Sequence, residues 1–253
     1  MKRRYKIFGF AVIAAHIVFR WFLFMKYTIL TGSMLPTIQV GESVYVCKLL
    51  YGWRLYNYWS NSPDHLSRIH GIREIVPGDV ILFNLPYIGY NVETIVFNPD
   101  VEYCKRVLGC PGDRIGAVDG HCWNDRVLRP VGVVEEQEKL RWMFDGFFRM
   151  TDSYDVIPYT DSGWNIKSWG PIIVPADGLT MELDDFTREL YRKVIEYETG
   201  EPLEESLMEY TFRGNYYFAV GDNAMSSFDS RYWGFIPEDF IIGIVCDRRI
   251  RNK

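Results

Sequence analysis

Two side chains in this sequence, Ser33 and Lys105, have the chemistry of a nucleophile and a base. Ser33 lies in "LTGSMLPTIQVGE" (30–42), directly after a threonine and a glycine and three residues before Pro36. By itself, "TGS" is typical of a turn or a helix cap. A serine hydroxyl is a weak nucleophile until a neighbouring group takes its proton, so catalysis by Ser33 requires a base.

The four histidines are poor candidates for that base. His16 lies in an apolar N-terminal segment, and His121 follows a glycine turn. The other two, His65 and His70, lie in a polar, aperiodic stretch. The sequence also has no GxSxG motif. These observations weaken a Ser-His-Asp interpretation and leave a serine–lysine pair as the natural variant.

Lys105 occurs within "VEYCKRVLG" (101–109), a pattern that predicts a β-strand. Side chains two apart share one face of a strand, so Lys105 belongs to the apolar row with Tyr103 and Val107, and Arg106 belongs to the other, more polar face. From this pattern alone, an edge strand with its lysine in solvent is the simpler interpretation. The alternative is a buried lysine, whose pKa falls because desolvation disfavours the charged form. A fall of about three units from ~10.4 corresponds to ~4 kcal/mol and would produce a suitable general base.

Two further features could serve such a site. The Thr31 hydroxyl and the Ser33 backbone N–H are candidate donors to an oxyanion, and losing one such donor typically costs ~3–4 kcal/mol. The segment "GDNAMSSFDSRYWG" (221–234) collects polar residues in one turn-rich stretch, where an aspartate and an arginine could brace the site. Its alternatives are a hydrogen-bonded loop or a calcium loop, and the carboxylate spacing disfavours calcium.

Composition excludes some classes of function. The chain has 253 residues, 48% of them hydrophobic, and a formal net charge of −5. We therefore expect no nucleic-acid partner. The five cysteines show no CxxC spacing and no HExxH motif occurs, so we expect no metal site and no cofactor. One disulfide is possible outside the cytoplasm, with its pairing open.

Residues 7–25 are almost all apolar and predict a transmembrane helix, since nineteen helical residues span ~28 Å. Four basic residues precede this segment, which places the N-terminus in the cytoplasm and the rest of the chain outside. A cleaved signal peptide is the alternative, but no small-x-small site follows. We therefore expect an uncleaved, single-pass anchor.

The rest of the sequence predicts a mostly β fold. Short β-rich runs such as "SVYVCKLLYG" (43–52) and "GDVILFNLP" (78–86) end at glycine or proline, and 53–77 suggests a long loop or hairpin. Residues 119–210 differ, with acidic clusters and a helix in "LDDFTRELYRKVIEYETG" (183–200). We expect a cytoplasmic tip and anchor at 1–26, a β-rich catalytic core from 27–118 and 211–250, and an inserted α+β lobe at 119–210.

Four segments in this order resemble the bacterial type I signal peptidase (leader peptidase) family of serine proteases. They are "TGSMLPTIQVGE" (31–42), "VPGDVILFNLP" (76–86), "YCKRVLGCPGDRI" (103–115) and "AVGDNAMSSFDSRYWGFIP" (219–237), about a quarter of the chain. Each segment is weak alone, but the ordered set behind an N-terminal anchor is highly specific. The family fold is mostly β, with a variable lobe inserted before the last segment. One span is found here, where some relatives have two.

The resemblance implies a membrane-anchored endopeptidase that removes signal peptides from exported preproteins on the outer, periplasmic side of the cytoplasmic membrane. Its substrates carry small residues one and three positions before the cut, and its partners are these preproteins and membrane lipid. Met34, Leu35 and the strand at 81–83 are our candidates for the substrate pockets. Carried onto matching positions, the implied roles are Ser33 as nucleophile, Lys105 as general base, Thr31 with Ser33 as oxyanion donors, Ser227 holding the lysine amine, Asp229 with Arg231 as an ion pair, and Gly221, Asp222 and Asn223 shaping the site.

The sequence is also compatible with three other functions. A self-cleaving Ser-Lys protease is chemically close, although a membrane anchor and the lack of a DNA-binding domain count against it. A noncatalytic, membrane-anchored β module that binds envelope partners is a second alternative. A processing peptidase with a narrow client range is the third, since its catalytic residues would be the same.

Overall fold

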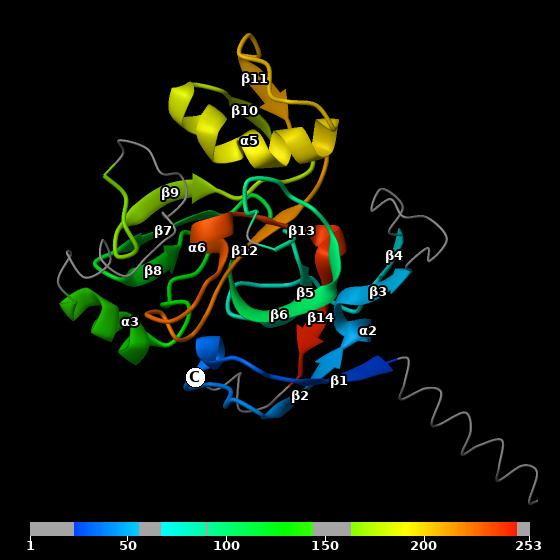
Figure 1. The fold of residues 1–253 in the computed structure, drawn as a ribbon, viewed down its shortest axis with the longest axis vertical. Coiled ribbons are helices and arrows are strands. Elements are labelled where there is room, and N and C mark those ends of the chain that lie inside the picture. The colour runs from blue at the N-terminus through cyan, green and yellow to red at the C-terminus, as the bar shows by residue number, and fades with distance from the viewer. Residues whose placement is uncertain (1–22, 56–66, 90, 144–162, 247–253) are drawn as a thin grey trace, which may run out of the picture.

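The computed structural model describes residues 23–55, 67–89, 91–143 and 163–246, and this part of the chain is β-rich, as the sequence predicts (Figure 1). Its centre is a seven-stranded sheet in the order β1-β2-β14-β5-β6-β12-β13, with neighbouring strands antiparallel. Strands that are far apart in the sequence therefore lie side by side. They are β1 (Phe24–Thr28), β2 (Ser43–Cys47), β5 (Val80–Leu85), β6 (Asn98–Gly109), β12 (Tyr216–Val220), β13 (Ile236–Pro237) and β14 (Ile241–Val245).

The predicted transmembrane segment at 7–25 lies almost wholly outside the described residues. Among the helices that the structure does describe, none is both long and apolar enough to cross a bilayer. The chain is already in β1 at Phe24, and Lys26 pairs with Tyr45 of β2. The expected end of the anchor at residue 26 thus falls inside a strand, and Phe24–Lys26 belong to the sheet.

Strand β6 is central, which corrects the simpler interpretation of its lysine. β5 pairs with one edge of β6 and β12 with the other. Lys105 lies opposite Ile81 of β5 and is only 2% exposed. The interpretation as an edge strand with a solvent-facing lysine is therefore wrong. Arg106, expected on a polar face, is also buried, because apolar clusters pack against both faces of the strand.

The strand predicted for 43–52 is half the expected length. After β2 the chain turns into the short helix α2 (Lys48–Tyr51), which carries it away from the sheet. It then forms β3 (Gly52–Leu55), which pairs antiparallel with β4 (Ser67–His70). These two strands match the hairpin expected for 53–77.

Beyond β6 a second group of elements begins. A three-stranded sheet in the order β8-β7-β9 is followed by a two-stranded sheet, β10-β11, and by the predicted helix, α5. Asp184 caps α5 by accepting a hydrogen bond from the Thr187 N–H, and Gly200 ends it in a left-handed conformation. The bounds are β7 (Arg114–Val118), β8 (His121–Asn124), α3 (Val134–Trp142), β9 (Trp169–Ile173), β10 (Thr180–Glu182), α5 (Asp185–Thr199) and β11 (Glu209–Thr211).

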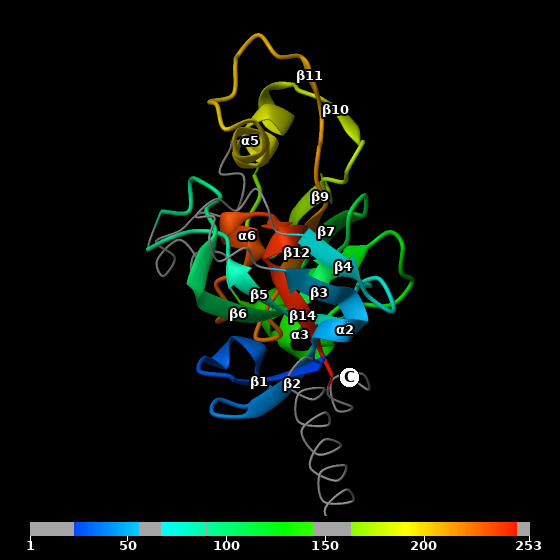
Figure 2. The ribbon, with the colours of Figure 1, turned by 90° about the vertical axis from the view of Figure 1, so that its right-hand side faces the viewer.

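The second group is packed into the central sheet. Leu190 and Val194 of α5 lie in the same apolar cluster as Leu108 of β6 and Phe218 of β12. β7, which ends at the expected boundary of the lobe, pairs with β8 and β9 beyond it. α5 lies at one end of the molecule, with β1 and β2 at the other (Figures 1 and 2).

Candidate active site

Ser33 lies in a short 3-10 turn, η1 (Gly32–Met34), between β1 and β2. Asn223, 190 residues later, holds this turn at two points. Its backbone N–H donates to the Ser33 carbonyl oxygen at 3.0 Å, and its Nδ2 donates to the Gly32 carbonyl oxygen at 3.1 Å. The Ser33 N–H has no acceptor within the turn, because the first N–H groups of a helical turn lack intrahelical partners. The Ser33 N–H and the Ser33 hydroxyl therefore lie on the same turn, whose backbone is held by Asn223.

The Lys105 amine lies directly against this serine. Nζ of Lys105 is 2.5 Å from Oγ of Ser33, although the two residues are 72 positions apart in the chain. Burial lowers the pKa of Lys105 to about 8, against the opposing effect of the Asp229 carboxylate. The Tyr103 ring lies on the same side, with its centroid 5.3 Å from Nζ. An amine with this pKa is partly uncharged near neutral pH and can accept the serine proton.

The Thr31 hydroxyl borders the same oxygen. Oγ1 of Thr31 is 3.2 Å from Oγ of Ser33. Thr31 is exposed, whereas Ser33 is 9% exposed, so the two hydroxyls lie at the edge between the interior and the surface.

Asp229 and Arg231 form a buried ion pair behind the lysine. Both guanidinium nitrogens that face Asp229 lie 2.8 Å from its carboxylate oxygens. Burial would raise the pKa of Asp229, but the charge and hydrogen bonds of Arg231 outweigh burial and lower it. The Asp229 carboxylate also accepts the Gly221 N–H at 2.9 Å. Helix α6 (Ser230–Trp233) is thereby tied to the end of β12.

A second buried ion pair joins Asp222 to Arg106, which was not among the predicted site residues. Nε and one terminal nitrogen of Arg106 each donate to Asp222 at 2.6 Å, and its other terminal nitrogen donates to the Gly78 carbonyl at 2.7 Å. Arg106 is adjacent to Lys105 but on the opposite face of β6. The one available signal was an arginine beside the candidate base, since its partner lies 116 residues further along the chain.

Ser227 was expected to contact the Lys105 amine, but it packs against Gly221. Ser227 is buried, and its Oγ has no hydrogen-bond partner among the described residues, so in this structure it does not hold the Lys105 amine. Gly221 packs against it so closely that a Cβ there would lie 2.1 Å from the Ser227 Oγ and 2.5 Å from the Ser33 carbonyl oxygen. Only glycine fits at 221.

The candidate pocket residues lie in the interior. Met34 and the strand residues 81–83 each have 0% exposure, and Leu35 is half-buried. Met34 packs with Leu82 in one apolar cluster, whereas Ile81 and Phe83 belong to another. They therefore do not form one common surface in this structure.

The described residues contain no cluster of three or more side chains suited to hold a metal ion. All five cysteines lie in the described part of the chain and are free thiols, four of them buried. The disulfide left open by the sequence is therefore not formed.

Comparison with known proteins identifies the family. A family model described as "Signal peptidase, peptidase S26" matches residues 1–246. The chain belongs to this family. Signal peptidase I of Pseudomonas aeruginosa is 27% identical over 246 residues, covering 96% of this chain and 68% of that protein. Signal peptidase I of Aquifex aeolicus is 26% identical over 244 residues, covering 92% and 78%. A crystal structure of a signal peptidase I from Enterococcus faecalis covers 70% of this chain and 100% of that one, at 18% identity and a TM-score of 0.34.

Membership of the signal peptidase family makes this chain a serine endopeptidase, in agreement with the resemblance found in its motifs. The conclusion also agrees with the chemistry of the site, in which a serine hydroxyl and a buried amine are in contact.

Proposed function

We propose that this signal peptidase cleaves signal peptides with Ser33 as its nucleophile and Lys105 as its general base. The observation that carries the assignment is the 2.5 Å contact between Nζ and Oγ, made by a lysine whose side chain is removed from water. Burial lowers the pKa of this amine to about 8, so a useful fraction is uncharged at neutral pH.

The reaction follows from this contact. Uncharged Lys105 takes the proton of Ser33 as Oγ attacks the scissile carbonyl carbon. The Ser33 N–H and the Thr31 hydroxyl donate to the resulting oxyanion. The lysine, now charged, gives its proton to the leaving amine, and the acyl-enzyme forms. Water then attacks the ester with Lys105 again acting as base, and the serine is regenerated.

The remaining site residues position this pair. Asn223 holds the two carbonyl groups of the serine turn. Gly221 allows the end of β12 to approach the same turn. Asp229 places a negative charge near the amine and stabilises the lysine after it accepts the proton. The lowered pKa shows that desolvation is the larger effect in the resting site.

The substrates and location belong to the same proposal. We assign as substrates preproteins with small residues one and three positions before the cut. The apolar segment at 7–25 and the basic residues before it support a single-pass anchor in the cytoplasmic membrane. On this topology the catalytic residues work on the outer side, where exported chains emerge.

Removal of either member of the pair tests the catalytic assignment. Ser33→Ala and Lys105→Ala should each reduce cleavage of a purified preprotein at least ~10⁴-fold, since members of such a unit act together. Ser226→Ala provides a matched control, because Ser226 is exposed in the 221–234 segment. Circular dichroism checks that each variant is folded. Appreciable cleavage by a folded Ser33→Ala or Lys105→Ala variant would remove that residue from its role.

Labelling separates the peptidase from a noncatalytic β module. A serine-acylating penem should modify the wild type at Ser33 and leave Ser33→Ala unlabelled, with the adduct located by mass spectrometry. A panel of preproteins with different signal peptides then measures the client range. Cleavage of a single member would identify a narrow-client processing peptidase.

A further inference from the structure

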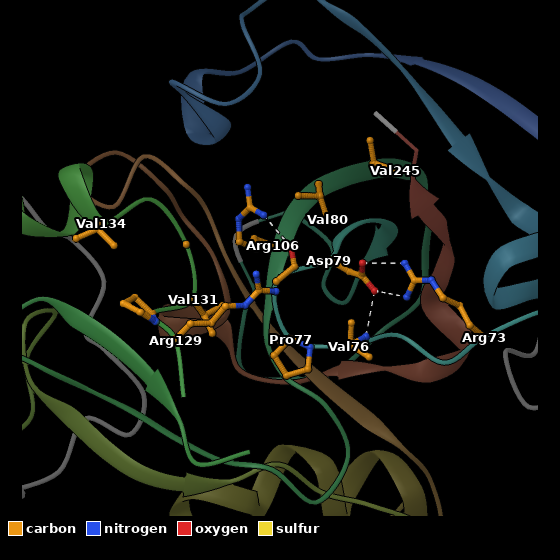
Figure 3. Close-up of a pocket in the computed structure, with 13 residues that line it drawn as sticks. Arg73, Val76, Pro77, Asp79, Val80, Arg106, Arg129, Val131, Val134 and Val245 are labelled. Atoms are coloured by element: carbon orange, nitrogen blue, oxygen red, sulfur yellow. Dashed lines mark hydrogen bonds and ion pairs between the residues drawn. The ribbon is translucent and has the colours of Figure 1, made fainter. Parts of the chain in front are cut away.

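A cavity of about 550 Å³ is lined in part by Arg106 of β6 (Figure 3). Alternation along the strand directs Arg106 and Lys105 to opposite faces, so the cavity lies on the face of β6 away from the lysine. Three arginines, Arg73, Arg106 and Arg129, contribute to its wall, together with valines that include Val76 and Val134. We call it the Arg129 pocket.

Two of the three arginines are neutralised within the protein. Arg73 forms a two-point ion pair with Asp79, at 2.6 and 2.8 Å, and Arg106 is held in the same way by Asp222. Arg129 differs, since no carboxylate in the described part of the chain pairs with it. Its side chain extends into the pocket (Figure 3), where one terminal nitrogen would lie 3.6 Å from a Cβ at Gly78. The pocket therefore carries one uncompensated positive charge.

The rest of the wall consists mainly of valines and prolines beside Asp79, and part of it is uncovered. Val76 is 50% exposed and Val134 is 41% exposed, and Pro77, Val131 and Val245 complete this side. A site with one guanidinium that no carboxylate neutralises, beside exposed aliphatic groups, is complementary to a molecule with one negative charge and an apolar part.

The position of the Arg129 pocket in the fold indicates which kind of anionic, partly apolar molecule could reach it. Val245 of its wall pairs with Val46 of β2, and Val46 pairs with Met25 of β1. Adjacent strands lie ~4.8 Å apart, so Val245 is about 10 Å from Met25, near the start of the described chain. On the proposed function, on which this step rests, that start is where the chain leaves the membrane. A pocket so placed is within reach of lipid headgroups.

We propose that the Arg129 pocket binds one anionic phospholipid headgroup. The phosphodiester carries a single negative charge, and two of its oxygens can accept both terminal N–H groups of Arg129. The glycerol and the first methylenes of the lipid contact Val76 and Val134. Inorganic phosphate offers the same oxygen acceptors without the apolar part, so it serves to distinguish a lipid site from a free-anion site.

The test uses the full chain in a neutral detergent. A short-chain phosphatidylglycerol is added below its micellar concentration, and native mass spectrometry counts the lipid molecules that each protein retains. We expect one saturable site, with Kd raised at least about tenfold in Arg129→Gln, the effect of losing one charged contact. Arg213→Gln is the matched control, because Arg213 is an exposed arginine that lines a different cavity. Thermal unfolding checks that both variants are folded.

Two further experiments distinguish a lipid headgroup from free phosphate as the bound anion. Val76→Ser should weaken phosphatidylglycerol binding severalfold, and inorganic phosphate and short-chain phosphatidylcholine should each compete at least tenfold less well than phosphatidylglycerol. If Arg129→Gln and Arg213→Gln lost the same affinity for phosphatidylglycerol, the Arg129 pocket would not be the binding site. Phosphate binding as tight as lipid binding, with Val76→Ser unchanged, would overturn the lipid assignment. Cleavage of a soluble preprotein is measured in the same samples without lipid, so a failure of the proposed function is seen separately.

Discussion

At the residue scale, the Lys105 amine is subject to two opposing effects. Burial removes it from water and disfavours its charge, while the Asp229 carboxylate favours that charge. The balance leaves the pKa at about 8, below the ordinary 10.5. Because catalysis requires the uncharged form, the same burial that activates the lysine also costs the folded state free energy whenever the amine is protonated.

The activity should therefore rise with pH across the neutral range. We expect kcat/KM to fall about tenfold for each pH unit below 8, as Lys105 gains its proton, and to level off above that pH. A pH–rate profile on a peptide substrate between pH 5 and 9 measures this. Lys105→Arg should be inactive throughout, because a guanidinium keeps its proton. A wild-type rate that stays constant down to pH 5 would contradict a lysine base.

The same lysine makes a prediction about stability. Unfolded Lys105 holds its proton up to about pH 10.5, whereas the folded protein releases it near pH 8. The unfolded state thus binds more protons in this interval, so wild-type stability rises with pH there. Lys105→Met lacks this dependence. Because protonated Lys105 destabilises the folded wild type, Lys105→Met should have the larger free energy of unfolding at pH 7. We expect this difference to shrink by about 2–3 kcal/mol between pH 7 and pH 10, at ~1.4 kcal/mol per pKa unit.

Urea unfolding of both proteins at several pH values measures that difference. An advantage that does not change with pH would mean that the folded-state pKa of Lys105 is close to its ordinary value.

Some features of the site were predictable from neighbouring residues and others were not. Alternation in "VEYCKRVLG" placed Lys105 in an apolar row, because strand faces follow from local sequence. It could not show that β6 is central, since β5 and β12 come from distant parts of the chain. Arg106 was assigned to a polar face for the same reason, as its partner Asp222 is 116 residues away. Long-range pairing leaves no trace in local spacing.

At the element scale, the segment after β12 fixes two other parts of the site. Gly221 packs against the turn that carries Ser33, and Asp222 holds Arg106 of β6. Three elements from different parts of the sequence are thus joined by two adjacent residues. Local sequence was also misleading for the elements themselves, because "KLLY" after β2 forms α2 in place of a longer strand.

Gly221→Ala should separate the end of β12 from the serine turn. The new Cβ would lie 2.5 Å from the Ser33 carbonyl oxygen, a backbone atom that cannot rotate away. We expect kcat to fall at least ~100-fold, since a displacement of ~1 Å at a catalytic group has that effect. Gly214→Ala is the control, because its Cβ would meet no atom closer than 3.4 Å. Wild-type turnover by Gly221→Ala would show that the close approach is dispensable.

Asp222→Asn tests the connection to β6. The substitution leaves the buried Arg106 charge without its carboxylate, which should reduce the free energy of unfolding by about 3–5 kcal/mol. Replacing both members with apolar residues, as Arg106→Met with Asp222→Leu, should recover much of that loss, because no unpaired charge remains. Chemical denaturation of the two variants measures the difference. Equal stability of the single and double variants would argue against a buried-charge penalty.

At the scale of the whole molecule, the expected lobe and core share an interior. The cluster that contains Leu190 of α5 also contains Phe218 of β12 and Leu108 of β6, the strand that carries the lysine. Sequence composition marked residues 119–210 as different from the rest of the chain. It could not show that their apolar side chains complete the same core.

Because of this shared interior, a cavity in α5 should weaken the central sheet. Leu190→Ala is expected to cost about 2–5 kcal/mol. Hydrogen exchange should then show the same loss of protection in the amides of β12 as in those of α5, because both open in one unfolding event. Leu128→Ala, at a fully exposed position, is the control. Loss of protection confined to α5 and its immediate neighbours would show instead that the two parts unfold independently.

The distribution of the five thiols has a practical consequence. Four are buried, and burial raises the pKa of three of them, Cys104, Cys110 and Cys122. Cys246 alone is exposed, directly after Val245 at the end of β14. A maleimide dye would therefore attach at one place without prior mutagenesis. At the end of β14, beside Tyr45 of β2, the dye would give single-molecule fluorescence a fixed reference point on the native enzyme.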